Sequence, residues 1–147
     1  MRRTHALVVA VILVVLTPFQ ANAFCFQAAG ERYGVSPWLL WGISRVESNM
    51  NPAAVHHNRN GSVDVGLMQI NSSWQRQLGG TWAEIKDPCT NVMVGAWLLR
   101  QCIQQFGYTW AAVGCYNSQD PARAQRYAAG VYAVLLSRGV LSPHDPR

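Results

Sequence analysis

Two acidic residues in this sequence, Glu47 and Asp64, have surroundings that suit acid–base chemistry. A carboxyl group that is buried can hold its proton near neutral pH, and a second carboxylate can stabilise a cation beside it. Cleavage of a glycosidic bond is a reaction that such a pair can perform. The other five acidic residues beyond position 23 have structural explanations as helix caps, solvated helix charges or part of the C-terminal tail: Glu31, Glu84, Asp87, Asp120 and Asp145.

Glu47 lies on the apolar face of a predicted helix, which is an unusual place for a glutamate. It follows Leu40 by seven residues and Ile43 by four, so the three side chains share one face. It also falls in the last turn, where the negative end of the helix dipole disfavours an anion. Burial and dipole together predict a raised pKa, as a general acid requires. The alternative is a glutamate that points outward at the end of the helix.

Asp64 follows Glu47 by 17 residues (64 − 47) and lies in a polar segment. In that segment Asn60-Gly61 separates two short pieces that contain valine, which predicts a β-hairpin. Asp64 could act chemically beside Glu47. It could also be a hairpin aspartate that only accepts hydrogen bonds from backbone amides.

Helices with recognisable caps must hold these residues in place. Gly34 can form a left-handed C-cap, and Ser36-Pro37 supplies an N-cap with a proline in the first turn. Asp87-Pro88 and Asp120-Pro121 repeat this start signal, and Thr109 caps a short helix. The pattern predicts a mainly α fold of the α+β type, a single helical domain with a small β-hairpin near residues 55–70. The expected helices, caps included, cover residues 24–34, 36–48, 87–107, 109–115 and 120–139.

The first 23 residues have the pattern of a secretory signal peptide. Arg2 and Arg3 precede an apolar run from Ala6 to Leu16, and Ala21-Asn22-Ala23 offers a cleavage site. The run is shorter than the roughly 18–20 residues that a membrane-spanning helix needs. We expect residues 1–23 to be removed, leaving residues 24–147 (147 − 23 = 124) as one periplasmic or secreted domain. We expect no stable membrane insertion after cleavage.

Charge and motifs argue against several classes of protein. Without Arg2 and Arg3 there remain 10 basic and 7 acidic residues, and this net charge of +3 suits a mildly anionic polymer such as cell wall. Lys86 is the single lysine and the arginines are scattered, which does not fit a nucleic-acid-binding surface. His56 and His57 would point to opposite sides of a strand, and no phosphate-binding glycine loop occurs. We expect a monomer with no metal, no cofactor and no nucleic-acid partner.

Four cysteines, Cys25, Cys89, Cys102 and Cys115, all lie in the part expected to be exported. An even number of cysteines in an exported chain favours two disulfides over free thiols. Four cysteines allow three pairings, and their spacing alone does not choose among them.

Four motifs, in order along the chain, resemble those of the lysozyme-like lytic transglycosylases. They are Glu47-Ser48-Asn49, Gly66 to Ser72, Ala112 to Ser118, and Tyr127. The resemblance is closest to the small exported members linked to secretion systems, conjugation and type IV pili. It implies a lysozyme-like fold, peptidoglycan glycan strands as substrate, and Glu47 as the catalytic acid/base. It also implies that the sugar-binding cleft is formed by Ser48, Gly66, Leu67, Met68, Gln69, Asn71, Tyr116, Asn117 and Tyr127.

The third motif departs from the family pattern at two positions. Cys115 stands where alanine is usual, and Gln119 stands where glycine is common, so this turn could differ in shape. Small relatives often carry one cysteine just after the signal peptide and another in an Asp-Pro-Cys element. The resemblance therefore implies a Cys25–Cys89 disulfide, which leaves Cys102 to bridge to Cys115.

The resemblance implies a reaction that needs one carboxylate. In lytic transglycosylases a single glutamate protonates the bond between N-acetylmuramic acid and N-acetylglucosamine, and the muramoyl 6-hydroxyl then closes a 1,6-anhydro ring. A hydrolytic muramidase is a rival, because residues 47–71 also resemble the active-site segment of c-type lysozymes, with Asp64 as the second carboxylate. A non-catalytic wall-binding or assembly protein is a further alternative.

Tryptophan rings can stack on sugars, and the chain has six of them. Trp41 and Trp97 fall within strongly apolar helices and are expected in the core. Trp74 follows the Gly66 to Ser72 motif closely, so it is the tryptophan expected nearest to the substrate.

Overall fold

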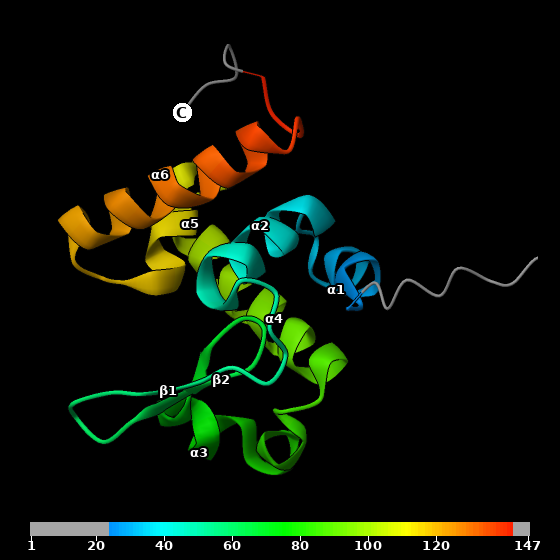
Figure 1. Cartoon of the computed structure of the whole chain (residues 1–147), viewed down its shortest axis with the longest axis vertical. Helices are drawn as coiled ribbons and strands as arrows, with labels where there is room; N and C mark the ends of the chain where they lie inside the picture. Colours follow the sequence, from blue (N-terminus) through cyan, green and yellow to red (C-terminus); the bar gives the residue numbers. More distant parts are fainter. Residues whose placement is uncertain (1–23, 143–147) are drawn as a thin grey trace, which may run out of the picture.

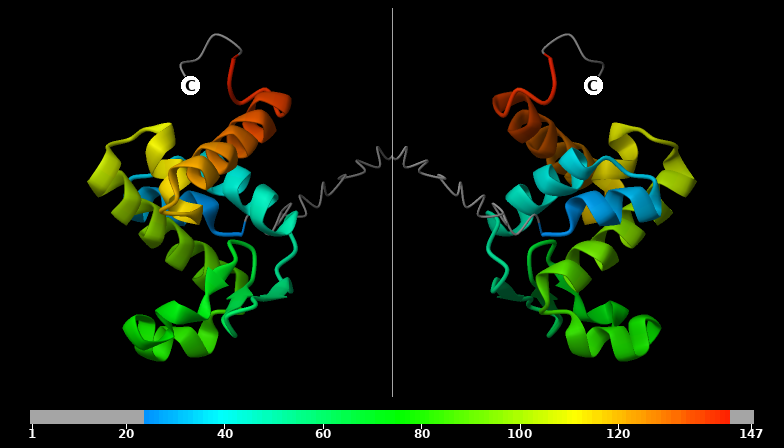
Figure 2. Two further views of the ribbon diagram at one scale, coloured as in Figure 1. Left: turned by 90° about the vertical axis from the view of Figure 1, so that its left-hand side faces the viewer. Right: turned by 90° about the vertical axis from the view of Figure 1, so that its right-hand side faces the viewer.

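The computed structural model describes residues 24–142, and the predicted signal peptide, residues 1–23, lies outside them. The described elements are α1 (Phe26–Tyr33), α2 (Pro37–Ser48), β1 (Val55–His57), β2 (Val63–Val65), β3 (Ile70–Asn71), the 3₁₀ helix η1 (Ser72–Trp74), α3 (Gln75–Leu78), the 3₁₀ helix η2 (Gly79–Glu84), α4 (Pro88–Phe106), α5 (Trp110–Asn117) and α6 (Pro121–Ser137). Figure 1 shows α1, α2, α5 and α6 in one part and the sheet with α3 in another. The long helix α4 runs from one part to the other, as both views of Figure 2 also show. The predicted α+β fold, mainly helical with a small sheet, is confirmed.

The helices begin where their capping residues predict. The side chains of Ser36, Asp87, Thr109 and Asp120 each accept a hydrogen bond from the backbone N–H three residues later. A proline follows the cap of α2, α4 and α6. Gly34 ends α1 in the left-handed conformation, with φ 64°. Helix α5 is longer than predicted, because it continues through the Tyr116-Asn117 motif to Asn117.

The sheet has three antiparallel strands in the order β1-β2-β3. β1 and β2 form the predicted hairpin, with His56 opposite Asp64. β3 adds a strand that the hairpin pattern does not predict, since it is only two residues long. This third strand places Asn71 beside Asp64 on β2.

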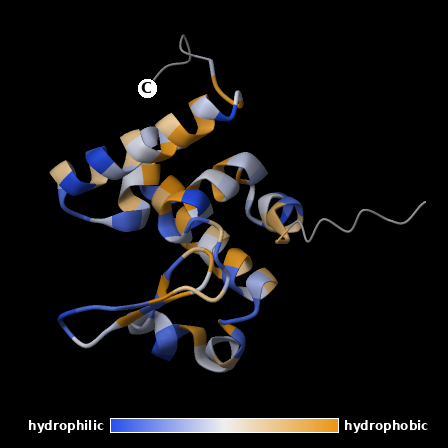
Figure 3. Cartoon of the chain, viewed as in Figure 1, coloured by the Kyte–Doolittle hydropathy of each residue, from blue (hydrophilic) through white to orange (hydrophobic). Residues whose placement is uncertain are grey.

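Helix α4 is the centre of the hydrophobic core. Its side chains Val92, Ala96, Leu99 and Ile103 are buried at alternating steps of four and three residues. Helices α1, α2 and α5 pack on α4, and α6 packs on α2 and α5. Figure 3 shows apolar residues along α4 and hydrophilic residues in the turn between β1 and β2. Among residues 24–142, neither α4 nor any other helix is long and apolar enough to span a membrane.

One buried side-chain amide joins α4 to the segment between β2 and β3. Asn91 Nδ2 donates hydrogen bonds to the carbonyl oxygens of Val65 (2.8 Å) and Ile85 (2.9 Å). Asn91 Oδ1 accepts one from the Met68 N–H (2.8 Å). Because the side chain is only 1% exposed, these partners replace the water that the amide would otherwise bind. The amide therefore determines where the segment crosses α4.

Two glycines allow this segment to lie close to α4. Gly66 has φ 82°, a conformation that favours glycine, and a Cβ there would overlap the Asn91 amide. Gly95 lies one turn after Asn91 on α4, and a Cβ there would overlap the Met68 side chain. Gly66 therefore leaves room for the Asn91 amide, and Gly95 leaves room for the Met68 side chain, so the loop packs directly on α4.

Disulfides join α4 to the helices that precede and follow it. Cys25, at the start of α1, is bonded to Cys89 in the first turn of α4. Cys102, in α4, is bonded to Cys115 in α5. These are the pairs that the family resemblance implies. Because their partners are 64 and 13 residues apart in sequence, both bonds restrict the unfolded chain, the first over a much longer loop.

The substitution Asn91→Leu should destabilise the domain strongly. Leucine is similar in size, but it leaves the Val65 and Ile85 carbonyls and the Met68 N–H unpaired in the core. Each unpaired buried group costs about 1–3 kcal/mol, so we expect the free energy of unfolding to fall by about 3–5 kcal/mol. Urea unfolding followed by circular dichroism measures the change.

Gln104→Leu is the control, because Gln104 is exposed on the same helix. Its free energy of unfolding should change by no more than about 0.5 kcal/mol. Equal stabilities for the two variants would show that the Asn91 amide does not hold the segment.

Candidate active site

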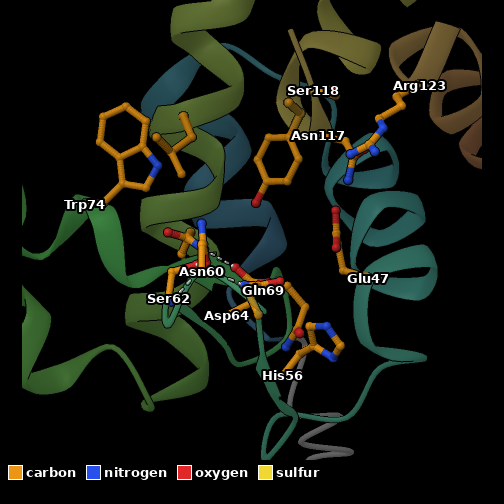
Figure 4. Close-up of a pocket in the computed structure, with 14 residues that line it drawn as sticks. Glu47, His56, Asn60, Ser62, Asp64, Gln69, Trp74, Asn117, Ser118 and Arg123 are labelled. Atoms are coloured by element: carbon orange, nitrogen blue, oxygen red, sulfur yellow. Dashed lines mark hydrogen bonds between the residues drawn. The ribbon is translucent and has the colours of Figure 1, made fainter. Parts of the chain in front are cut away.

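A cleft with a volume of about 640 Å³ opens between the end of α2, the sheet, and the ends of α5 and α6 that face it. Figure 4 shows Glu47 on one wall and Asp64 on the sheet, with both side chains directed into the cleft. Amides and hydroxyls dominate the lining, which suits a ligand rich in hydroxyl and amide groups. The lining residues are Glu47, His56, Asn58, Asn60, Ser62, Asp64, Gln69, Asn71, Trp74, Leu98, Tyr116, Asn117, Ser118 and Arg123.

Glu47 is a partly buried carboxyl group in the last turn of α2. Burial raises its pKa from 4.5 to about 7; the hydrogen bond from Tyr127 lowers it, and the negative charge of Asp64 raises it. Glu47 therefore does not point outward, and the rise in pKa is the one that the apolar helix face predicts. A carboxyl group with a pKa near 7 can give and take a proton at neutral pH.

Two stacked tyrosines form the wall behind Glu47. Tyr127 on α6 donates a hydrogen bond from its hydroxyl to Glu47 Oε1 at 2.5 Å. Its ring stacks on Tyr116, with centroids 6.5 Å apart and planes inclined by 20°. Tyr116 in turn donates its hydroxyl proton to the Met68 carbonyl oxygen at 2.8 Å. Burial and the neighbouring Glu47 raise the pKa of both tyrosines well above 10, so both hydroxyls remain donors.

Asp64 is held by two side-chain amides. Its Oδ2 accepts a hydrogen bond from Asn58 Nδ2 (2.8 Å), and its Oδ1 accepts one from Asn71 Nδ2 (2.6 Å). If Asp64 were only a hairpin residue, its hydrogen bonds would come from backbone amides. In the structure the donors are the side chains of Asn58 and Asn71, which also line the cleft. Asp64 is thus both a structural hydrogen-bond acceptor and a charge that acts on Glu47.

The segment from Gly66 to Gln69 contributes to the cleft through only one side chain. Gln69 lines the cleft, whereas Leu67 and Met68 are fully buried and belong to the core. Of the motif residues predicted to form the sugar-binding cleft, Leu67 and Met68 therefore have their side chains in the core, and Gly66 packs on Asn91. The motif residues alone do not indicate which of these side chains are buried, because their burial depends on contact with α4.

Ser48 does not line the cleft either. Its hydroxyl donates a hydrogen bond to the Leu67 carbonyl oxygen at 2.8 Å and lies 3.2 Å from the Ser44 carbonyl oxygen. This bond joins the end of α2, next to Glu47, to the buried loop. Ser48 therefore positions the helix end that carries Glu47.

Residues from the C-terminal helices complete the cleft. Asn117 ends α5 and Ser118 follows it in an extended conformation, so the third motif is a helix end here. Arg123 in the first turn of α6 and His56 on β1 also line the cleft, and sequence reasoning assigned neither to it. In the sequence, only their closeness to a motif residue could have indicated that Arg123 and His56 line the cleft.

Trp74 lines the cleft as expected, and its ring meets Trp97 edge to face.

The sequence of the chain is similar to those of several known proteins. Residues 24–132 match the family described as Transglycosylase SLT domain. The chain is 37% identical over 130 residues to the invasion protein IagB of Salmonella typhimurium, covering 83% of this chain and 81% of that protein. It is 37% identical over 146 residues to the protein IpgF of Shigella sonnei, covering 92% and 95%. It is also 34% identical over 133 residues to an X polypeptide of Escherichia coli, covering 81% and 79%.

The substitution Tyr127→Phe should raise the pKa of Glu47 further. The lost hydrogen bond is the interaction that lowers this pKa, while burial and the charge of Asp64 remain. Carbon-detected NMR titration of the glutamate side chains should show Glu47 titrating near 7 in the parent protein and above 7 in the variant. Tyr116→Phe is the control, because its hydroxyl binds Met68, so Glu47 should keep its pKa. A lower pKa in Tyr127→Phe would contradict this account.

Proposed function

Because the chain belongs to the transglycosylase SLT domain family of peptidoglycan lytic transglycosylases, we propose that it cleaves glycan strands with Glu47 as the single acid/base. The bond cleaved is the β-1,4 linkage between N-acetylmuramic acid and N-acetylglucosamine, and the product carries a 1,6-anhydro ring. The observation that carries this proposal is the raised pKa of Glu47, about 7, at the wall of a polar cleft.

In the first step Glu47 acts as the acid. The Tyr127 hydroxyl occupies Glu47 Oε1, so the carboxyl proton is carried by Oε2. Transfer of this proton to the glycosidic oxygen breaks the bond from that oxygen to the muramoyl anomeric carbon. Positive charge then develops on the sugar, and the new carboxylate of Glu47 together with Asp64 stabilises it.

In the second step Glu47 acts as the base. It takes the proton from the muramoyl 6-hydroxyl, whose oxygen attacks the anomeric carbon of the same sugar. One carbon–oxygen bond has broken and one has formed, the proton has returned to Glu47, and no water has been consumed. A group with a pKa near the working pH is suited to both transfers.

The lining residues that do not exchange protons are proposed to bind the sugars. The Asn117 amide and the Gln69 side-chain oxygen match hydroxyl and acetamido groups, whereas the Asn71 amide is bonded to Ser62, Asp64 and the Ser73 N–H. Trp74 offers a ring for stacking on a sugar, and this ring contacts Trp97 edge to face.

A hydrolytic muramidase is the second candidate, because Asp64 lines the same cleft and its charge reaches Glu47. Asp64 accepts one hydrogen bond on each carboxylate oxygen, from Asn58 and from Asn71, and each oxygen keeps a further lone pair, so these bonds are compatible with either an electrostatic or a nucleophilic role. The family to which the chain belongs is what supports the transglycosylase reaction over hydrolysis.

The proposed setting is local remodelling of the cell wall for a secretion, conjugation or pilus assembly. The motifs resemble those of small exported enzymes linked to such assemblies, and one relative at 37% identity is named an invasion protein. The predicted signal peptide would bring the enzyme to the periplasm or beyond.

The substitution Glu47→Gln should abolish strand cleavage while the protein remains folded. Glutamine keeps the shape of the side chain but cannot transfer a proton, so kcat should fall by at least about 100-fold. Mass spectrometry of digested peptidoglycan should show 1,6-anhydro ends with the parent protein and none with the variant. Reducing ends alone from the parent protein would identify a hydrolase, and full activity of the variant would remove Glu47 from the mechanism.

The substitution Asp64→Asn separates the two candidate reactions. A transglycosylase should keep activity within about tenfold, whereas a hydrolase that needs a second carboxylate should lose on the order of a thousandfold. Because the charge of Asp64 raises the pKa of Glu47, its removal should also move the alkaline limb of the kcat–pH profile to lower pH. Thermal unfolding of the variant controls for the altered hydrogen bonds to Asn58 and Asn71.

A further inference from the structure

Arg123 brings a permanent positive charge to the cleft. In the described part of the chain it is the only arginine or lysine among the residues that line the cleft. It lies in the first turn of α6, where Asp120 caps the helix by accepting the Arg123 backbone N–H and not its guanidinium. Within residues 24–142 the guanidinium forms no ion pair within 4.0 Å, so neither Glu47 nor Asp64 neutralises it.

The orientation of Arg123 points to a ligand in the cleft. Figure 4 shows its side chain extending from α6 toward the Glu47 side of the cleft, well separated from Trp74. The side chain is exposed, so the charge is accessible to a substrate that enters. The cleft thus has an aromatic side at Trp74 and a cationic side at Arg123.

The sugars of peptidoglycan do not themselves call for a cation. N-acetylglucosamine is neutral, and the lactyl group of N-acetylmuramic acid is neutral while a stem peptide is attached to it through an amide. The negative charges of an intact strand lie on the carboxylates of these stem peptides. A planar guanidinium with several donors in a fork matches a carboxylate in a bidentate arrangement.

We propose that Arg123 is a specificity determinant that binds a carboxylate of the stem peptide next to the bond being cleaved. The proposal rests on the proposed function, since it places a substituted muramoyl residue at the Glu47 side of the cleft. Arg123 contributes to binding in the ground state and takes no part in proton transfer. The enzyme therefore distinguishes strands that carry charged stem peptides from strands that do not.

Three preparations of the same glycan strands test the proposal. The first keeps its stem peptides, the second has all stem carboxylates converted to neutral amides, and the third has the stem peptides removed by an amidase, which leaves the lactyl carboxylate free. The parent protein should cleave the first with kcat/KM roughly five- to twentyfold above that for the second. This preference should shrink at high salt, because the ion pair is near the surface.

Arg123→Gln should lose the preference, with a raised KM for native strands and an unchanged kcat. Arg123→Lys should keep part of it, because lysine retains the charge but not the fork. Arg126→Gln is the matched control, because Arg126 is exposed on the same helix, carries the same charge and does not line the cleft. It should behave like the parent protein.

Several outcomes would overturn the proposal. One is an equal effect of Arg123→Gln on native and amidated strands. Another is an effect on amidase-treated strands as large as on native strands, which would assign Arg123 to the lactyl carboxylate. A third is a fall in kcat with unchanged KM, which would place Arg123 in the chemical step. If the parent protein yields no 1,6-anhydro ends from native strands, the proposed function itself fails, whatever Arg123 does.

Discussion

The hydrogen bonds of the buried Asn91 amide are the constraint on which the site depends. They fix the crossing of the Gly66–Gln69 segment over α4, and the segment in turn accepts bonds from two other elements. The Leu67 carbonyl oxygen accepts a hydrogen bond from the Ser48 hydroxyl at the end of α2. The Met68 carbonyl oxygen accepts one from the Tyr116 hydroxyl on α5. One loop, buried on α4, therefore sets the relative positions of Glu47, the sheet and the tyrosine wall. The motif residues of this loop thus act more by positioning the other residues of the site than by contacting a ligand.

The chemical property of Glu47 follows from this packing. Moving its pKa from 4.5 to about 7 corresponds to at most about 3 kcal/mol, which is the added cost of ionising the carboxyl group in its folded surroundings. Because the pKa is raised on folding, protonation favours the folded state. This contribution is present in full below pH 4.5 and is lost as the pH rises through about 7. A cost of this size is tolerable because α4, its disulfides and the caps of the helices stabilise the rest of the domain.

The two carboxylates of the cleft have different surroundings. Glu47 receives one hydrogen bond, from a tyrosine whose own pKa is raised, and it stands on an apolar helix face. Asp64 receives two amide hydrogen bonds within a small polar sheet. Burial raises the pKa of Glu47 so that it can carry a proton near neutral pH, while the two amides hold the Asp64 side chain in place. The division of roles between a proton carrier and a fixed charge rests on this difference.

The sequence alone determined the starts of α2, α4, α5 and α6, the apolar face that carries Glu47, and the family to which the chain belongs. These depend on local chemistry: a serine or aspartate before a proline caps a helix whatever surrounds it, and ordered motifs are visible without coordinates. Tertiary structure decided the rest. The hydroxyl that reaches Glu47 lies 80 residues away in sequence, and the short strand β3 has no pattern of its own. The close packing of Met68 on α4 depends on Gly95, a residue of another element. Arg123 enters the cleft for the same reason, because a side chain's neighbours across a fold depend on packing between helices and not on spacing along the chain.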